Sequence, residues 1–316
     1  MPSTHTNHQD SLVSAHWLAK RIHEPGIRVI DCTTYMVAQP VGPSKILSGK
    51  PDHKKAHIHG AVHIDMVDDL SDPNGQYPYT AIDTMQFNHL LARLGIEPTD
   101  HVVLYGQSGI STITRAWFIF YLHGQSVSIL DGGLANWVAS GYETTDEQTT
   151  DELNTNLRNT TTQTTSPKNK NATSTAQEAS RQREPEVNRI VNREVVQQAS
   201  QNRDTQLINA LSAAQFAGAG GAHYGRPGRI PNSLNLPAKD MIDPATGCFW
   251  DIETLAQKVK AAGISLEAPA IHYCGGGIAA TTSAFVMHLL GARHWSVYDD
   301  SLLDWSNQAH CPMVRD

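Results

Sequence analysis

The chain repeats itself across its two halves. The segment from Tyr105 to Trp137 aligns with the segment from Tyr273 to Trp305 at a constant offset of 168 residues, which pairs Asp131 with Asp299. Self-similarity of this length indicates an internal duplication. The chain is therefore expected to fold into two units of one architecture, so any feature present in only one half needs a separate explanation.

Each half alternates short apolar runs with helical patterns. The runs Val29 to Cys32, Val102 to Tyr105 and Val127 to Leu130 have the length and composition of buried strands. Thr84 to Leu94 and Thr112 to Leu122 carry apolar residues at helical spacing instead. This alternation predicts an α/β fold of two tandem domains, each with a mostly parallel central sheet flanked by helices.

A polar region separates the two repeats. From Glu143 to about Gln198 the chain is rich in Thr, Asn, Gln and Arg and contains no aromatic residue. Such a composition buries too little apolar surface to offset the entropy of ordering. We therefore expect an N-terminal domain in residues 1–144, a mostly disordered linker in 145–198 with a short helix near Glu186 to Ser200, and a C-terminal domain in 199–316.

Charge and composition exclude several classes of protein. The 316 residues include 24 basic and 31 acidic ones, and the net charge of −7 disfavours a nucleic-acid partner. The N-terminus lacks a secretory signal and no apolar stretch is long enough to span a bilayer, so a cytoplasmic protein without a membrane partner is expected. The four cysteines form no Cys-x-x-Cys pair, which argues against a disulfide scaffold or a cysteine zinc site.

Cys274 has the surroundings of a reactive thiol. It ends an apolar run, is followed by three glycines, and precedes a helical pattern from Thr281 to Leu290. Glycines allow successive N–H groups to turn inward as an anion-binding nest in front of a helix N-terminus. Such surroundings favour the nucleophilic thiolate. The counterpart of Cys274 in the first half is Gly106, so we expect one active site per chain, with the first half forming a wall of its cleft.

Five motifs together resemble the two-domain rhodanese family, which comprises thiosulfate and 3-mercaptopyruvate sulfurtransferases. The resemblance covers nearly the whole chain outside the linker and lies in the order and spacing of the motifs. They are the Cys274-Gly-Gly-Gly-Ile-Ala loop, His57-Ile-His-Gly-Ala, Gly228-Arg-Ile-Pro-Asn-Ser, Asp131-Gly-Gly-Leu-Ala-Asn-Trp137 and Tyr298-Asp-Asp-Ser-Leu-Leu-Asp-Trp305. The family implies two rhodanese-like domains, of which the first has no catalytic cysteine.

The resemblance also implies a sulfurtransferase reaction. Cys274 would take a sulfane sulfur from an anionic donor, thiosulfate in preference to 3-mercaptopyruvate, and pass it as a persulfide to cyanide, a thiol or a thioredoxin-like acceptor. Neither a metal nor an organic cofactor is expected, and the duplication favours a monomer. The persulfide anion would be stabilised by the N–H groups of the loop, namely those of Gly275, Gly276, Gly277, Ile278, Ala279 and Ala280.

The chain departs from the family where the donor should bind. Thiosulfate enzymes commonly have basic residues in the loop and mercaptopyruvate enzymes a serine at its third position, whereas this chain has Gly275 and Gly276. The family's Asp-x-Arg reads Asn209-Ala210-Leu211. Arg226 and Arg229 are candidate replacements, because a guanidinium binds a carboxylate or sulfonate in a bidentate manner. Solvent exposure is the alternative for both arginines.

Other interpretations stay open. The mercaptopyruvate branch uses a first-domain histidine that corresponds to His57, for which packing at the domain interface is the alternative. His53, His57, His59 and His63 could instead form a zinc site. A phosphatase of this fold needs Cys-x5-Arg, and Ala280 stands at the arginine position. Finally, Cys274 could serve a persulfide carrier or redox-sensing module that a protein partner feeds and that does not turn over.

Overall fold

The first half of the chain forms an α/β unit around a five-stranded parallel sheet. The computed structural model describes residues 8–37, 39, 44–147, 189–220 and 224–316. The sheet order is β1-β7-β6-β2-β5, and β3 and β4 form a separate antiparallel hairpin. The elements are η1 (His8–Ser11), β1 (Leu12–Val13), α1 (Ala15–Arg21), β2 (Ile27–Asp31), β3 (Thr34–Val37), β4 (Lys45–Ser48), α2 (Lys50–His53), β5 (Val62–His63), α3 (Thr84–Leu94), β6 (His101–Tyr105), α4 (Ile110–Leu122), β7 (Ser126–Leu130) and α5 (Gly133–Ala139).

The second half repeats this architecture. Its parallel sheet has the order β10-β9-β11-β12-β8, which reads in reverse as the counterpart of the first sheet, strand for strand. The expected α/β class and the parallel sheets are confirmed. The elements are β8 (Ile190–Val191), α7 (Arg193–Asn202), β9 (Gln206–Asn209), α8 (Ala213–Ala217), β10 (Ser233–Asn235), η3 (Ala238–Met241), α9 (Ile252–Ala261), β11 (Ala270–Tyr273), α10 (Ala280–Leu289), β12 (Trp295–Tyr298) and α11 (Ser301–Trp305).

The second sheet begins earlier in the chain than the expected domain boundary at residue 199. Strand β8 pairs with β12 at the sheet edge, and α7 follows it directly. The physical reason is local: Ile190 and Val191 are apolar enough to extend the sheet, and the Asn192 side chain caps α7 by accepting from Val195 N. Residues 148–188 of the expected linker lie outside the described residues.

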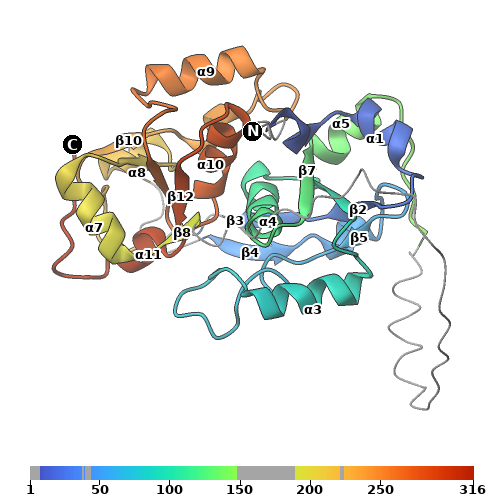
Figure 1. The fold of residues 1–316 in the computed structure, drawn as a ribbon, viewed down its shortest axis with the longest axis horizontal. Coiled ribbons are helices and arrows are strands. Elements are labelled where there is room, and N and C mark those ends of the chain that lie inside the picture. The colour runs from blue at the N-terminus through green and yellow to red at the C-terminus, as the bar shows by residue number, and fades with distance from the viewer. Residues whose placement is uncertain (1–7, 38, 40–43, 148–188, 221–223) are drawn as a thin grey trace, which may run out of the picture.

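The two halves meet across a reciprocal interface. Figure 1 shows α4 and α10 between the two sheets. Thr114 and Thr282, which are equivalent at the offset of 168, contact each other through their hydroxyls at 2.9 Å. The equivalent rings of Trp117 and Phe285 lie 4.7 Å apart. When equivalent residues touch each other, the interface has the isologous geometry of a two-fold dimer. Both halves of this interface are carried by one chain.

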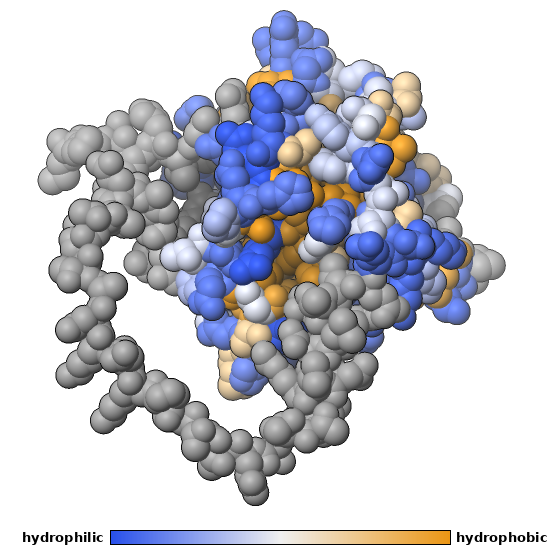
Figure 2. Space-filling view, turned by 90° about the vertical axis from the view of Figure 1, so that its right-hand side faces the viewer, coloured by the Kyte–Doolittle hydropathy of each residue, from blue (hydrophilic) through white to orange (hydrophobic). Residues whose placement is uncertain are grey.

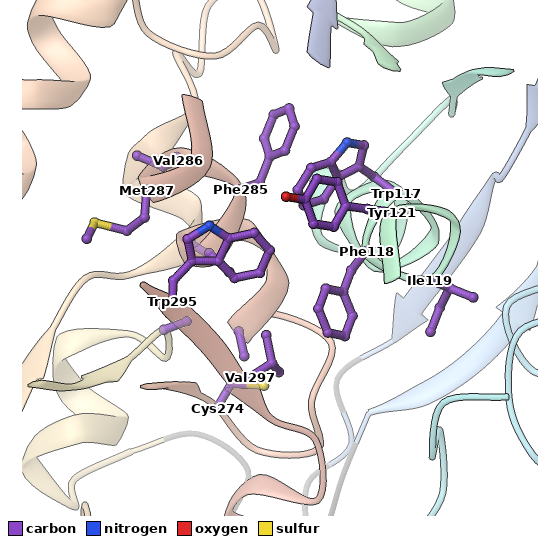
Figure 3. Close-up of a cluster of buried hydrophobic side chains, with 14 of the residues drawn as sticks. Trp117, Phe118, Ile119, Tyr121, Cys274, Phe285, Val286, Met287, Trp295 and Val297 are labelled. Carbon is purple, nitrogen blue, oxygen red and sulfur yellow. The ribbon is translucent and has the colours of Figure 1, made fainter. Parts of the chain in front are cut away.

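Aromatic residues fill the space around that pseudo-two-fold axis. Figure 3 shows Trp117, Phe118 and Tyr121 of α4 facing Phe285 of α10 and Trp295 at the start of β12. The rings of Trp117 and Trp295 are 6.2 Å apart, and both residues are almost fully buried. Large aromatic contacts of this kind dominate the stability of an interface, so the two halves form one continuous core.

The outer surface of the first half is largely hydrophilic. Figure 2 shows hydrophilic side chains over most of that face, with one central strip of apolar ones. Within the described ranges, no helix combines the length and the apolar character that crossing a bilayer requires.

Candidate active site around Cys274

Cys274 stands at the carboxyl end of the central strand of the second sheet. All four residues of β11 are buried, and Cys274 itself is 2% exposed. Its N–H donates to the Ser301 hydroxyl at 3.1 Å, and its carbonyl accepts from Leu302 N at 3.2 Å. The carbonyl of Gly275 accepts from Leu303 N at 2.9 Å. Hydrogen bonds to the first residues of α11 therefore fix the backbone of the loop at Cys274 and Gly275.

Two glycines of the loop are required by close contacts. A Cβ at Gly275 would lie 1.9 Å from Cζ of Tyr224, so the phenol ring occupies the space a side chain would need. A Cβ at Gly277 would lie 2.3 Å from the carbonyl oxygen of Asp299, and its φ of +85° is in the left-handed region. The glycines thus let the loop pack between a ring and a backbone, in addition to shaping the turn.

The backbone N–H groups of this loop are available to an anion. From Gly275 to Ala279, none of them donates to another group in the described part of the chain. Helix α10 begins at Ala280 without a side-chain cap, so its first N–H groups add to the same field. The anion-binding nest around Cys274 stays a prediction, to which these N–H groups without acceptors are suited.

A small cavity lies in front of the sulfur. Its volume is about 30 Å³, whereas a cavity of about 10–15 Å³ already holds one water molecule. Both halves line it: Met36, Ile46 and Tyr79 come from the first, and Leu211 and Tyr224 from the second. Among the described residues, none that lines it is Lys, Arg or His. The space beside the sulfur is narrow and is lined mainly by apolar side chains.

A buried arginine from the first half supports the loop. Arg115 of α4 is 1% exposed and pairs with Asp299. Its guanidinium also donates to the carbonyl of Tyr79 at 2.5 Å and, weakly, to the carbonyl of Gly277 at 3.5 Å. Tyr79 has a φ of +69°, which is uncommon outside glycine. Arg115 thus joins a wall residue of the cavity to the loop and to the second half.

The equivalent aspartates of the two halves, Asp299 and Asp131, differ in whether an arginine pairs with them. Asp299 accepts from Ala81 N and Asp131 from Phe249 N, both at 2.8 Å, and these four residues are related by the offset of 168. The equivalent of Arg115 is Ser283, and Asp131 forms no ion pair with any residue of the described ranges. Burial accordingly raises the pKa of Asp131. Among the described residues, a buried cation therefore lies beside Asp299 and none lies beside Asp131.

Arg226 and Arg229, the candidate anion ligands, have other partners in the structure. Arg226 donates to the carbonyls of Ser306, Gln308 and Cys311 at 2.7–2.9 Å. Arg229 donates to the carbonyl of Phe216 and pairs with the Asp316 side chain at 2.7 Å. Neither arginine lines the cavity. Both tie the C-terminal segment to the body of the second half, and their part in donor binding stays a prediction.

His57 is buried in the first half and does not line the cavity. Its Nδ1 donates to the carbonyl of His53 at 2.8 Å, and its ring stacks on that of His53 at 4.2 Å. His53 in turn lies 2.9 Å from the Asp31 carboxylate, and His63 contacts the carbonyl of Thr33. In the part of the chain that the structure describes, no group of His, Cys, Asp or Glu residues could hold a metal ion.

The motifs did not indicate Arg115, Tyr79 or Tyr224. A signal for Arg115 was present, because it is the one charged residue in the apolar pattern of Thr112 to Leu122 and has Ser283 as its repeat partner. Tyr79 and Tyr224 lie in other loops, and tertiary packing brings them next to the loop after Cys274. The spacing of residues in the sequence does not show this proximity.

Comparison with known proteins places the fold and the motifs in context. Residues 14–140 match the family model of the rhodanese-like domain. Thiosulfate/3-mercaptopyruvate sulfurtransferase 1, mitochondrial, of Arabidopsis thaliana is 28% identical over 307 residues, which cover 96% of this chain and 78% of that protein. The 3-mercaptopyruvate sulfurtransferase of Escherichia coli strain K12 is 27% identical over 310 residues, covering 95% and 96% of the two chains.

Solved structures share the fold over most of their length. SseA from Escherichia coli, a protein of the 3-mercaptopyruvate class, superposes with a TM-score of 0.71 at 24% identity, covering 92% of this chain and 98% of its own. The anaerobic ergothioneine biosynthesis enzyme from Chlorobium limicola superposes with a TM-score of 0.74 at 19% identity, covering 100% of this chain and 72% of its own. Because both identities are below 25%, these two likenesses establish the fold alone.

Proposed function

Because the chain belongs to the two-domain rhodanese family of sulfurtransferases, we propose that it transfers a sulfane sulfur through a persulfide on Cys274. The observation that carries this proposal is the position of Cys274 at the end of β11, where it lines a cavity of about 30 Å³ and precedes loop N–H groups that have no acceptor among the described residues. In the proposed first half-reaction the thiolate attacks the outer sulfur of thiosulfate or the thiol sulfur of 3-mercaptopyruvate. The donor's S–S or C–S bond breaks, and its electron pair leaves with sulfite or as the enolate of the 2-oxo acid. The outer sulfur then occupies the cavity.

The loop supplies the stabilisation this step needs. As the new S–S bond forms, the charge of the Cys274 thiolate passes to the leaving group, and the persulfide anion that results carries its negative charge on the outer sulfur. We expect the N–H groups of residues 275–279, which have no acceptor among the described residues, and the N-terminal end of the α10 dipole to stabilise this charge, because burial strengthens their effect. In the second half-reaction the acceptor, which is cyanide, a thiol or a thioredoxin-like protein, attacks the outer sulfur and restores the thiolate.

The proposal is tested by intact mass and turnover on the same sample. Incubation of the reduced protein with either donor should add one sulfur at Cys274, and cyanide should then give thiocyanate over many turnovers. Cys274→Ser should abolish both signals, whereas Cys248→Ser and Cys311→Ser should keep most of the activity. Cys311 is a matched control, because it is also buried. Sulfur transfer that survives in Cys274→Ser would refute the proposal.

The uncharged cavity favours a second candidate function. A narrow site without a cationic side chain among its described lining residues suits a persulfide carrier that a protein partner loads and that does not turn over small donors. Stoichiometric labelling of Cys274 without continued thiocyanate production would favour the carrier.

We also propose that the protein is a monomer, because the chain completes the interface between its two halves within itself. Its location in the cytoplasm stays a prediction.

A further inference from the structure

Tyr224 places a phenol beside the reactive sulfur. Its ring lies over Gly275, where a Cβ would fall 1.9 Å from Cζ, the ring carbon that bears the hydroxyl. Tyr224 also lines the cavity in front of Cys274. The hydroxyl therefore lies at the loop, next to the space in which a donor must react.

The backbone around Tyr224 is fixed by several contacts. The Asn307 side chain donates to the Tyr224 carbonyl at 3.0 Å. The following residue, Gly225, packs so tightly that a Cβ would lie 2.2 Å from the Ser306 hydroxyl. Arg226 then donates to the carbonyls of Ser306 and Gln308. A group held in this way needs little reorganisation to act on a bound molecule.

The phenol is available as a donor. In the described part of the chain the Tyr224 hydroxyl has no hydrogen-bond partner. Burial and the charge of the Cys274 thiolate raise the pKa of Tyr224, so the hydroxyl keeps its proton when the thiolate is present. The site thus offers an uncharged O–H donor where no cationic side chain of the described residues lines the cavity.

We propose that Tyr224 is a catalytic residue that donates a hydrogen bond to the oxygen of the leaving group, and that it selects 3-mercapto-2-oxo acids over thiosulfate as donors. This inference rests on the proposed role of Cys274. The resemblance favoured thiosulfate as the donor, and this inference favours 3-mercapto-2-oxo acids instead. The reason is that Tyr224 offers a neutral hydrogen-bond donor, whereas the thiosulfate dianion would be bound by a cation.

The two donors differ in what their leaving group requires. With a 3-mercapto-2-oxo acid, the Cys274 thiolate forms a bond to the thiol sulfur, the C–S bond breaks, and its electron pair leaves as an enolate. Tyr224 donates to the enolate oxygen while the charge develops. The proton of the Cys–S–SH product then moves to the carbon, which gives the 2-oxo acid and the persulfide anion. With thiosulfate, the S–S bond breaks and its electron pair leaves with sulfite, which needs no proton.

The experiment compares persulfide formation in wild type and Tyr224→Phe with both donors. Phenylalanine keeps the ring that packs on Gly275 and removes only the hydroxyl. We expect kcat/KM for 3-mercaptopyruvate to fall about 100-fold, as for loss of one hydrogen-bond donor to a developing oxyanion, and that for thiosulfate to change less than about threefold. Tyr142→Phe is the matched control, because its hydroxyl contacts only the remote His16 among the described residues.

Each outcome decides the inference. An equal loss with both donors in Tyr224→Phe would show a structural role, and no loss with 3-mercaptopyruvate would show that the hydroxyl is not used. A wild-type protein that forms the Cys274 persulfide from thiosulfate alone would overturn the inference about Tyr224 while keeping the proposed function. A wild-type protein loaded by neither donor would overturn both.

Discussion

Replacing Asp299 by Asn tests whether the buried ion pair joins the two halves. The substitution keeps an oxygen that can accept from Ala81 N but removes the counter-ion of Arg115, which is 1% exposed. Leaving one partner of a buried pair without its counter-charge costs about 3–5 kcal/mol. We therefore expect the free energy of unfolding to fall by that amount in Asp299→Asn.

Asp131→Asn provides the control at the equivalent position of the other half. Asp131 accepts from Phe249 N as Asp299 does from Ala81 N, but has no arginine partner in the described part of the chain. Because asparagine keeps the acceptor, we expect a change within about 1 kcal/mol. Since burial raises the pKa of Asp131, removal of its charge acts in the stabilising direction.

The assay is equilibrium urea unfolding followed by tryptophan fluorescence, to which the interface residue Trp117 contributes. With an m value of about 3 kcal/mol/M, a loss of 4 kcal/mol moves the midpoint down by roughly 1.3 M. The Asp131→Asn midpoint should stay within about 0.3 M of wild type on the same scale. Equal shifts in the two variants would refute the reasoning, because only Asp299 faces a buried cation.

Three further predictions test other contacts. Gly277→Ala should lower both Tm and kcat/KM, because its Cβ would meet a backbone oxygen at 2.3 Å, whereas Gly247→Ala, with similar φ and open space around it, should cost only about 1–2 kcal/mol of backbone strain. Burial and the charges of Asp299 and Asp304 raise the pKa of Asp300 to about 6, so the folded state loses stability as the pH rises from about 4 to 6. Asp300→Asn should therefore raise Tm at pH 7.5 and leave it unchanged near pH 4; a rise of equal size at both pH values would contradict this. Arg226→Ala should lower Tm, since three carbonyls lose their donor, and a higher KM for the donor at unchanged Tm would instead support its role as an anion ligand.

The repeat and the alternation of strand and helix patterns were sufficient to predict the fold. Helix α3 has the predicted bounds, and β2, β6 and β7 fall on the three apolar runs. These elements follow from local periodicity, which the sequence carries directly. The expected start of the second domain at 199 came too late, because β8 has only two residues and a polar context. So short an edge strand has no periodicity to detect.

The candidate site was predictable where it is contiguous in the chain. Cys274 and its loop form one segment, so residue type and order were enough to indicate them. Tyr79, Arg115 and Tyr224 reach the site from three separate segments. Their roles depend on how the halves dock and on how loops fold over the sheet, which are tertiary properties. The same limitation applies to Arg226, whose three carbonyl partners lie 80 or more residues further along the chain.

The placement of Arg115 has a consequence for how the two duplicated halves evolve. After a gene duplication, a copy that has lost its nucleophile is free to accumulate mutations unless selection acts on it for another reason. Here the copy without the thiol contributes the counter-ion of Asp299 and a wall of the cavity. Selection for sulfur transfer therefore acts on both copies, and a hybrid gene that joins this second half to a foreign first half would have to inherit the matching arginine.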